Sequence, residues 1–156
     1  MTTEPTQHPI RASNCNRAYA CPPSIWRELD FPDEQSPAAA EGSLLHAAIA
    51  ARFRHEPWNK LLTPEQEGVV RACYDGYWAG LGICDSPRVE QTLIVRDSDY
   101  ELIFDRPVTA DVVTFNEEHG VIIDWKTGRA NPDVCAAQDL QLVCYAVALR
   151  TGICWR

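Results

Sequence analysis

The spacing of apolar residues predicts two helices in the first half of the chain. One covers residues 38–54, and a second covers residues 64–81, where apolar side chains recur at helical intervals. Thr63 and Gln66 match a capping box at the start of the second helix, and Pro64 suits its first helical position. Both helices are therefore expected to begin and end close to these bounds.

The N-terminal part is less regular. Residues 1–12 are polar and lack periodicity, so we expect them to be disordered. Residues 13–31 predict a short helical segment that breaks at Pro22 and Pro23 and resumes at Ser24.

From Pro87 onward the pattern changes to that of strands. Apolar and β-branched runs predict strands at residues 89–95, 100–106, 108–115 and 120–128. The polar segment 116–119 predicts a hairpin turn between the last two, and a long helix is expected over residues 132–150. Helices, then an antiparallel meander, then a helix indicate a layered α/β or α+β domain with one sheet.

Length and composition favour one globular domain. The chain has 156 residues, of which 46% are hydrophobic. No secretory signal pattern is seen at the start, and no apolar run approaches the roughly 20 residues that cross a bilayer. A cytoplasmic protein that makes no membrane contact is the expectation.

The charge argues against broad non-specific binding to nucleic acid. The net charge is −8, and residues 61–156 hold eight Lys and Arg against fifteen Asp and Glu. Because phosphates are neutralised by basic side chains, a DNA-binding surface would have to be local, or depend on metal ions or a partner.

Asp124 and Lys126 are the first candidates for chemistry. They follow the apolar run 121–123, and alternation along a strand would point both side chains to the same face. Charged side chains at the end of a buried strand are energetically costly unless they form an ion pair or bind a ligand. When these two residues are considered alone, a plain salt bridge is the favoured interpretation.

Asp111 changes that balance. It lies in an apolar strand, and a turn centred near residues 117–118 would bring it opposite Asp124. Two facing carboxylates repel each other, but they are reasonable ligands for a divalent cation such as Mg²⁺. Lys126 beside them could orient or deprotonate a water molecule, or stabilise charge on a phosphate.

Two further groups of polar residues lie on the predicted helices. His46 is on the 38–54 helix, where an ordinary packing role is the simpler interpretation, and Gly42 before it suggests a close approach by another segment. Gln141 and Tyr145 are separated by four residues and so share a helical face, where both could simply edge a packed surface.

Taken together, these segments resemble the four ordered motifs of RecB-type nucleases of the PD-(D/E)XK superfamily. The segments are GSLLH (42–46), TADVV (109–113), IIDWKTG (122–128) and QLVCY (141–145). Residues 12–29 also resemble the N-terminus of phage and CRISPR-associated members. Each motif is weak by itself, but four in order are strong. The resemblance implies a restriction-endonuclease-like α/β core, with a central mixed sheet, an antiparallel meander and flanking helices, over residues 13–156.

The resemblance also implies roles for individual residues. Asp111, Asp124 and Lys126 match the catalytic residues, and the two aspartates, His46 and the carbonyl group of Trp125 match the ligands of Mg²⁺ or Mn²⁺. Gln141, Tyr145 and Gly42 match positions that contact substrate or support the site, and Glu90 is a candidate additional acid.

The leading hypothesis is therefore a metal-dependent deoxyribonuclease, most simply an exonuclease, that acts on DNA in recombination, repair, or phage or CRISPR DNA processing. The alternative is a catalytically inactive subunit that binds nucleic acid or supports assembly, which the net charge of −8 favours. A small-molecule metal hydrolase is a third hypothesis, but no zinc-type ligand cluster supports it.

The seven cysteines include no CxxC pair, so a zinc ribbon is not expected. Cys73, Cys135 and Cys144 are expected to be small core residues, and Cys15 or Cys21 could be ligands. Some relatives hold an iron–sulfur cluster with one early cysteine and three late ones, but here only Cys154 follows Tyr145 in a suitable segment. We expect the chain to bind no such cluster. We also expect it to be a fragment, or to need a partner that covers the sheet edge near residues 153–155.

Overall fold

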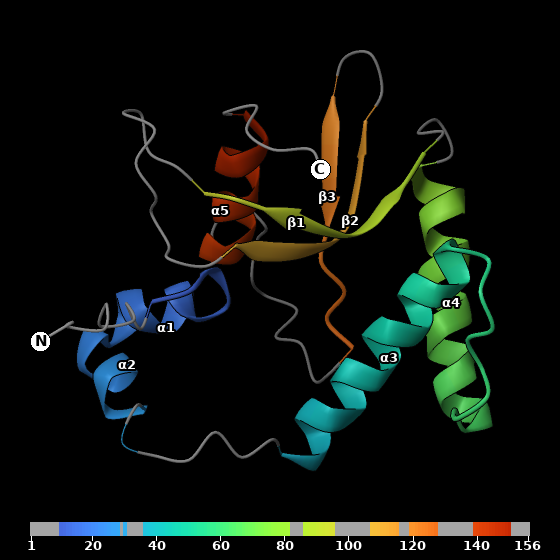
Figure 1. Cartoon of the computed structure of the whole chain (residues 1–156), viewed down its shortest axis with the longest axis horizontal. Coiled ribbons are helices and arrows are strands. Elements are labelled where there is room, and N and C mark those ends of the chain that lie inside the picture. Colours follow the sequence, from blue (N-terminus) through green and yellow to red (C-terminus); the bar gives the residue numbers. More distant parts are fainter. Residues whose placement is uncertain are drawn as a thin grey trace, which may run out of the picture. The chain divides into compact units, whose positions relative to one another are not determined.

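The computed structural model describes residues 10–28, 30, 36–81, 86–95, 107–115, 119–127 and 139–150 (Figure 1). The chain divides into two compact units. The first comprises residues 1–33, 92–109 and 133–156, and the second comprises residues 34–91 and 110–132.

Two helices, α3 (Pro37–Phe53) and α4 (Pro64–Leu81), form the larger part of the second unit. Ser36 caps α3 by accepting a hydrogen bond from the amide of Ala39 at 3.2 Å. The predicted capping box at α4 is confirmed, because the Thr63 amide donates to Gln66 Oε1 at 3.0 Å and the Gln66 amide donates to Thr63 Oγ1 at 3.3 Å. Capping thus fixes both starts within one residue of the prediction.

The core of this unit lies between α3, α4 and one strand of the sheet. Its buried members are Leu45, Ala48, Ile49, Phe53, Val70, Tyr77 and Val112. Phe53 meets Tyr77 edge to face, with ring centroids 5.1 Å apart, which is a favourable aromatic geometry. These contacts fix α3 against the strand that contains Val112, next to Asp111.

Three strands form the sheet of the described residues, in the order β1 (Arg88–Leu93), β2 (Val108–Phe115) and β3 (Gly120–Ile123). The antiparallel hairpin predicted for the last two is confirmed, since Val112 pairs with Ile123 and Phe115 pairs with Gly120. The α/β architecture, with an antiparallel meander flanked by helices, is also as expected.

The predicted strand over residues 120–128 was too long. β3 ends at Ile123, and residues 124–127 are not in a strand. The physical reason is that the Trp125 amide donates to the side chain of Asp111 at 2.6 Å, so a carboxylate takes the place of a ladder acceptor. The expected strand at residues 100–106 lies outside the described residues.

Short helices form most of the described part of the first unit. They are η1 (Ala12–Asn14), α1 (Cys15–Ala20), α2 (Pro22–Glu28) and α5 (Leu140–Arg150). Asn16 joins α1 to the start of α5, because its side chain donates to Asp139 Oδ1 at 3.0 Å and accepts from the Leu140 amide at 2.9 Å.

Three predictions about these helices need correction. Ala12, expected in a disordered segment, begins η1 and is 2% exposed. α2 begins at Pro22, because proline fits the first turn of a helix. Asp139 is not helical, because its carboxylate accepts the Gln141 amide at 2.9 Å and caps α5. Residues 132–138, the first part of the helix expected over residues 132–150, lie outside the described residues.

Four cysteines are described, and all are free thiols. Cys73 is half-buried beside the core, as expected for a small packing residue. Cys144 is also half-buried, and its Sγ atom lies 4.0 Å from that of Cys15. Cys21 is exposed. Cys135 and Cys154 lie outside the described residues. No described helix is both long and apolar enough to cross a membrane.

We expect Cys144 to react slowly with alkylating reagents. Burial, assisted by the neighbouring Cys15, raises the pKa of the Cys144 thiol to about 12, so little of the reactive thiolate is present at pH 8. In an iodoacetamide time course followed by peptide mass spectrometry, Cys144 should be modified on the order of a hundredfold more slowly than the exposed Cys21. Its rate should rise as the pH is raised towards 10. Equal rates for the two cysteines at pH 8 would contradict this assignment.

Candidate active site

The β2–β3 hairpin brings two aspartates together. Because Val112 pairs with Ile123, Asp111 and Asp124 are the next positions beyond the last pair of the ladder. Both side chains are largely buried, with exposed fractions of 12% for Asp111 and 7% for Asp124. Two carboxylates that meet at the end of a ladder, away from bulk water, are the central feature of the second unit.

Asp111 connects three segments of this unit. Its Oδ1 atom lies 3.0 Å from Nδ1 of His46 on α3, and its Oδ2 atom accepts the Trp125 amide at 2.6 Å. The hydrogen bond with Asp111 raises the pKa of His46, and this outweighs the opposing effect of burial. The charges of Asp111 and Asp124 and a backbone hydrogen bond with Trp125 raise it further. The imidazole is thereby biased towards its cationic form.

Asp124 and Lys126 form an ion pair. The Lys126 side chain is half exposed, whereas its partner is buried. Burial raises the pKa of Asp124, the ammonium group of Lys126 lowers it, and the nearby Asp111 carboxylate raises it again. The plain salt bridge considered from the sequence is thus present, but it lies beside a second carboxylate and an imidazole.

Glu90 lies close enough to interact electrostatically with these groups. Partial burial of its carboxyl group raises the pKa of Glu90, and the charge of Asp111 raises it further, whereas Arg54 and His46 lower it. Its φ angle is +52°, a left-handed conformation that is unusual for a non-glycine residue in a strand. Such strain is often retained where a side chain has a functional direction.

Gly42 lies on α3 next to the segment that follows β3. A Cβ atom built at this glycine would lie 3.8 Å from Oγ1 of Thr127, which is an ordinary contact distance. Thr127 therefore lies beside Gly42 at a distance that leaves room for a methyl group, so no approach that requires glycine is seen among the described residues. Thr127 was not singled out from the sequence, although it directly follows Lys126.

The donor atoms suit a hard divalent cation. Carboxylate oxygens are the ligands that Mg²⁺ and Mn²⁺ prefer, and Asp111 and Asp124 supply them on neighbouring segments. Within the described part of the chain, no group of three or more His, Cys, Asp or Glu side chains is arranged as a ready-made metal site. Instead, His46 and the Trp125 amide occupy the two oxygens of Asp111.

Gln141 and Tyr145 belong to the first unit, on α5. The Gln141 side-chain amide donates to the Tyr145 hydroxyl at 2.7 Å, and this hydroxyl donates to the Thr109 carbonyl at 2.9 Å. Tyr145 is 3% exposed. The pair therefore holds α5 to the first residues of β2, the strand that later contains Asp111.

Comparison with known proteins gives one match. The family model of the PD-(D/E)XK nuclease superfamily matches residues 12–154. The searches of curated proteins and of solved structures give no match.

Replacing Gly42 by alanine tests whether α3 has room for a side chain at this position. The extra methyl group meets Thr127 at an ordinary distance, so the better helix propensity of alanine should raise the free energy of unfolding by up to about 1 kcal/mol. Gly68→Ala on α4 is the matched control, because a Cβ there meets nothing within 4 Å. Urea unfolding should show similar gains for both variants. A clear loss of stability in Gly42→Ala alone would mean that Thr127 lies closer to this position than the distance of 3.8 Å allows for.

The backbone strain at Glu90 can be separated from its charge. Glycine adopts the left-handed conformation without penalty, whereas alanine retains the strain and removes the carboxylate. Glu90→Gly should therefore be more stable than Glu90→Ala by about 1 kcal/mol in chemical denaturation. The opposite order would show that this conformation is not adopted in solution.

Proposed function

Because the chain belongs to the PD-(D/E)XK nuclease superfamily, we propose that it is a Mg²⁺- or Mn²⁺-dependent deoxyribonuclease with Asp111, Asp124 and Lys126 as its catalytic residues. The single observation that supports this most strongly is the hairpin register, which makes the two aspartates the next pair beyond the ladder. A buried pair of like charges is costly to keep unless a cation or a reacting phosphate uses it.

The cation would be held by the carboxylates of Asp111 and Asp124 and by the carbonyl group of Trp125, with His46 as an associated ligand. When bound, a divalent cation stabilises negative charge on the phosphate and lowers the pKa of a bound water molecule. Oxygen donors from two carboxylates and a carbonyl fit this choice of metal. His46 and Asp111 contact each other in the structure, so at least one of them would change its hydrogen bonds when the metal binds.

Lys126 is the residue proposed to act on the reacting groups. Its ammonium group contacts Asp124, yet half of the side chain is open to solvent, so the charge can reach an incoming phosphodiester. There it would orient the attacking water molecule or stabilise charge on the phosphate oxygens. Asp124 would keep the ammonium group close to the metal ligands, because a short ion pair restricts the flexible lysine side chain.

We further assign the chain to the RecB-type members, with exonuclease activity on DNA. The support is the order of the four sequence motifs, from Gly42 and His46 to Gln141 and Tyr145. The last two would order the β2 strand through the Thr109 carbonyl. Glu90 would add a further acidic group, consistent with its electrostatic interaction with Asp111.

A non-catalytic nucleic-acid-binding subunit is the second candidate. The observation in its favour is the net charge of −8, which is poorly suited to an enzyme that must hold DNA by its backbone. Retention of both aspartates and the lysine favours the enzyme. The two candidates differ in one measurable property, which is cleavage.

Asp124→Ala and Lys126→Ala should both remove cleavage of linear DNA in the presence of Mn²⁺, but for different reasons. The first loses a metal ligand, so metal binding should also weaken, as measured by calorimetric titration of Mn²⁺. The second should keep metal binding within about threefold while cleavage falls by at least about a hundredfold, the usual range for loss of an electrostatic catalytic group.

Lys60→Ala is the matched control, since Lys60 is an exposed lysine of the second unit outside the site. It should cleave like the parent protein, and EDTA should stop cleavage by both. DNA binding without cleavage by the parent protein would favour the non-catalytic candidate. Unchanged cleavage by Asp124→Ala would reject the site. His46→Ala should be less severe and should change the preference between Mg²⁺ and Mn²⁺, because imidazole is a poor ligand for Mg²⁺.

A further inference from the structure

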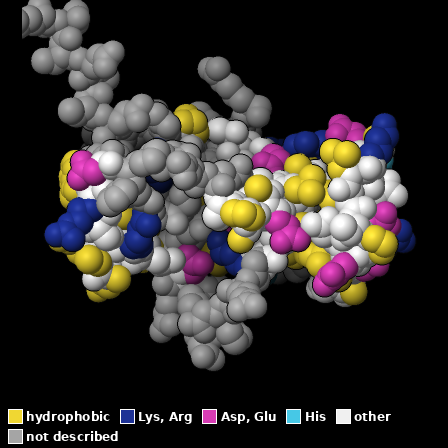
Figure 2. Space-filling view, turned by 90° about the horizontal axis from the view of Figure 1, so that it is seen from below, with side chains coloured by type: hydrophobic (Ala, Val, Ile, Leu, Met, Phe, Trp, Pro, Cys, Tyr) yellow, Lys and Arg dark blue, Asp and Glu magenta, His cyan; other side chains and the backbone are white. Residues whose placement is uncertain are grey.

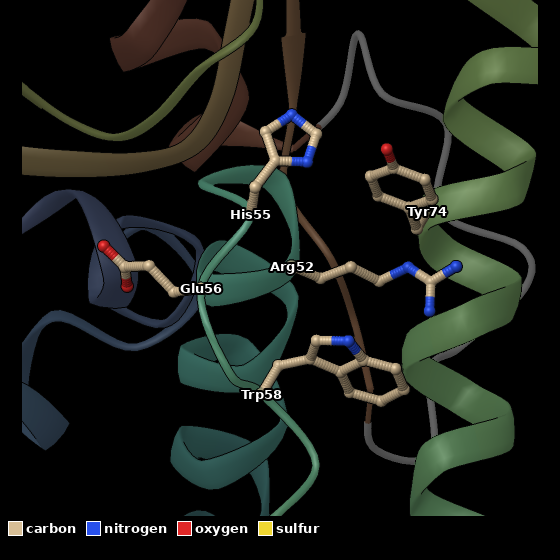
Figure 3. Close-up of a pocket in the computed structure, with 5 residues that line it drawn as sticks. All are labelled: Arg52, His55, Glu56, Trp58 and Tyr74. Atoms are coloured by element: carbon tan, nitrogen blue, oxygen red, sulfur yellow. The ribbon is translucent and has the colours of Figure 1, made fainter.

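A polar pocket lies at the C-terminal end of α3. Arg52, His55, Glu56, Trp58 and Tyr74 line it, and its volume is about 310 Å³. Figure 3 shows Arg52 reaching from α3 towards α4, with Trp58 on one side and Tyr74 on the other. All five residues belong to the second unit. None of them belongs to the family motifs or to the acidic cluster formed by Asp111 and Asp124.

The guanidinium group of Arg52 is held between two aromatic rings. Its Cζ atom lies 4.4 Å from the ring centre of Tyr74 and 4.9 Å from that of Trp58. Both distances are within the range of a cation–π interaction. The stack fixes the plane of the guanidinium group and removes much of the entropy that a free arginine would lose on binding a ligand.

Among the described residues, the charge of Arg52 is only weakly neutralised. Its described ion pair is with Asp75 at 3.5 Å, and the Asp75 side chain is 70% exposed, so this contact is long and solvated. The Nε atom is buried and has no hydrogen-bond partner among the described residues. By contrast, Arg71, which also lies over Trp58, is paired with Glu67 at 3.1 Å. Arg52 is therefore a rigid cation with unused hydrogen-bonding capacity.

The surroundings favour an anion. His55 adopts a left-handed backbone conformation with φ of +60°, and its exposed imidazole lies at the same pocket. The carboxylate of Glu56 points away from the guanidinium group in Figure 3. A planar guanidinium beside an imidazole and two aromatic rings matches a phosphate group, which arginine binds with two parallel hydrogen bonds. The rings also suit an adjacent nucleobase, because stacking on aromatic side chains is sequence-tolerant.

We propose that this pocket binds a phosphate group of the nucleic-acid strand, with Arg52 as the anion-binding residue and Trp58 and Tyr74 as the groups that position it. The choice of a nucleic-acid strand as the source rests on the proposed nuclease function. Arg52 follows His46 by six residues on α3, which corresponds to about 9 Å along the helix axis and about a third of a turn around it. A nucleic-acid strand bound at this pocket would approach the acidic cluster past the end of α3, and it would not compete for the metal ligands.

The proposal also accounts for how an acidic chain could hold its substrate. On the face drawn in Figure 2, the basic side chains of the described residues are interspersed with acidic and apolar ones. A small number of preorganised arginine contacts would then replace a broad basic surface.

Fluorescence anisotropy with a labelled single-stranded oligonucleotide in EDTA tests the site without cleavage. Arg52→Gln should weaken binding about tenfold, which corresponds to about 1.4 kcal/mol. Arg52→Lys should be intermediate, since it keeps the charge but loses the planar fork. Lys60→Gln removes the same charge outside this pocket and should change binding less than twofold. Equal losses in Arg52→Gln and Lys60→Gln would overturn the proposal.

Asp75→Asn keeps the aromatic stack and removes the competing carboxylate, so binding should tighten two- to threefold. This variant protects the test against poor folding of the Arg52 variants, because Asp75 is exposed. Unchanged or weaker binding in Asp75→Asn would count against Arg52 as the anion site.

The source of the phosphate is identified by NMR of the Arg52 Nε–H group. The resonance should shift with the oligonucleotide, and inorganic phosphate should compete at higher concentration. A shift with inorganic phosphate alone, or with neither probe, would overturn the proposal.

The cleavage reaction separates this proposal from the proposed nuclease function. If the protein cleaves DNA and Arg52→Gln has the same KM as Lys60→Gln, the pocket is rejected but the nuclease function is not. A protein that never cleaves, but loses binding in Arg52→Gln, would reject the nuclease while keeping the pocket.

Discussion

The arrangement of the second unit depends on the two hydrogen bonds of the Asp111 carboxylate. One oxygen contacts His46 of α3, and the other accepts the amide of Trp125 beyond β3. Hydrogen bonds to a charged group contribute roughly 1.5–3 kcal/mol each to the stability of a fold. Through these two bonds one side chain joins a helix, a strand and the segment that contains Asp124 and Lys126. The cost is that the Asp124 carboxylate lies nearby, where burial and then the charge of Asp111 raise its pKa. The ammonium group of Lys126 offsets that repulsion in the protein alone, and a bound cation would offset it further.

The sequence predicted the local part of this arrangement well. Capping residues fixed the start of α4, and β2 spans the residues expected for it. The two strands around a short polar turn predicted the register that pairs Val112 with Ile123, and hence the meeting of Asp111 and Asp124. These features depend on residues close in sequence, whose preferences can be evaluated without knowing the rest of the fold.

Features that depend on distant residues were not predicted. β3 ends early because the Asp111 side chain takes the Trp125 amide, and Asp139 leaves the helical conformation because it caps α5 and contacts Asn16. The Arg52 stack requires α3, the following loop and α4 to meet, and no motif indicates it. Helix and strand propensities and residue spacing cannot predict that a side chain replaces a backbone hydrogen-bond acceptor. They also cannot predict that aromatic rings from different elements meet around one arginine.

The pairing of α3 with α4 has a consequence for the order of folding. Gln66 belongs to the capping box of α4, and its side chain also donates to Glu41 on α3 at 2.9 Å, so these helices are joined by contacts between residues close in sequence. Such contacts close small loops and form early, whereas the contact of His46 with Asp111 spans 65 residues. The helix pair would then act as the nucleus on which the hairpin condenses, and the acidic cluster would assemble late. Changes within the helix pair should mainly slow refolding, and changes in the hairpin should mainly speed unfolding. The charged centre could therefore diverge in sequence with little effect on the rate at which the unit reaches its native state.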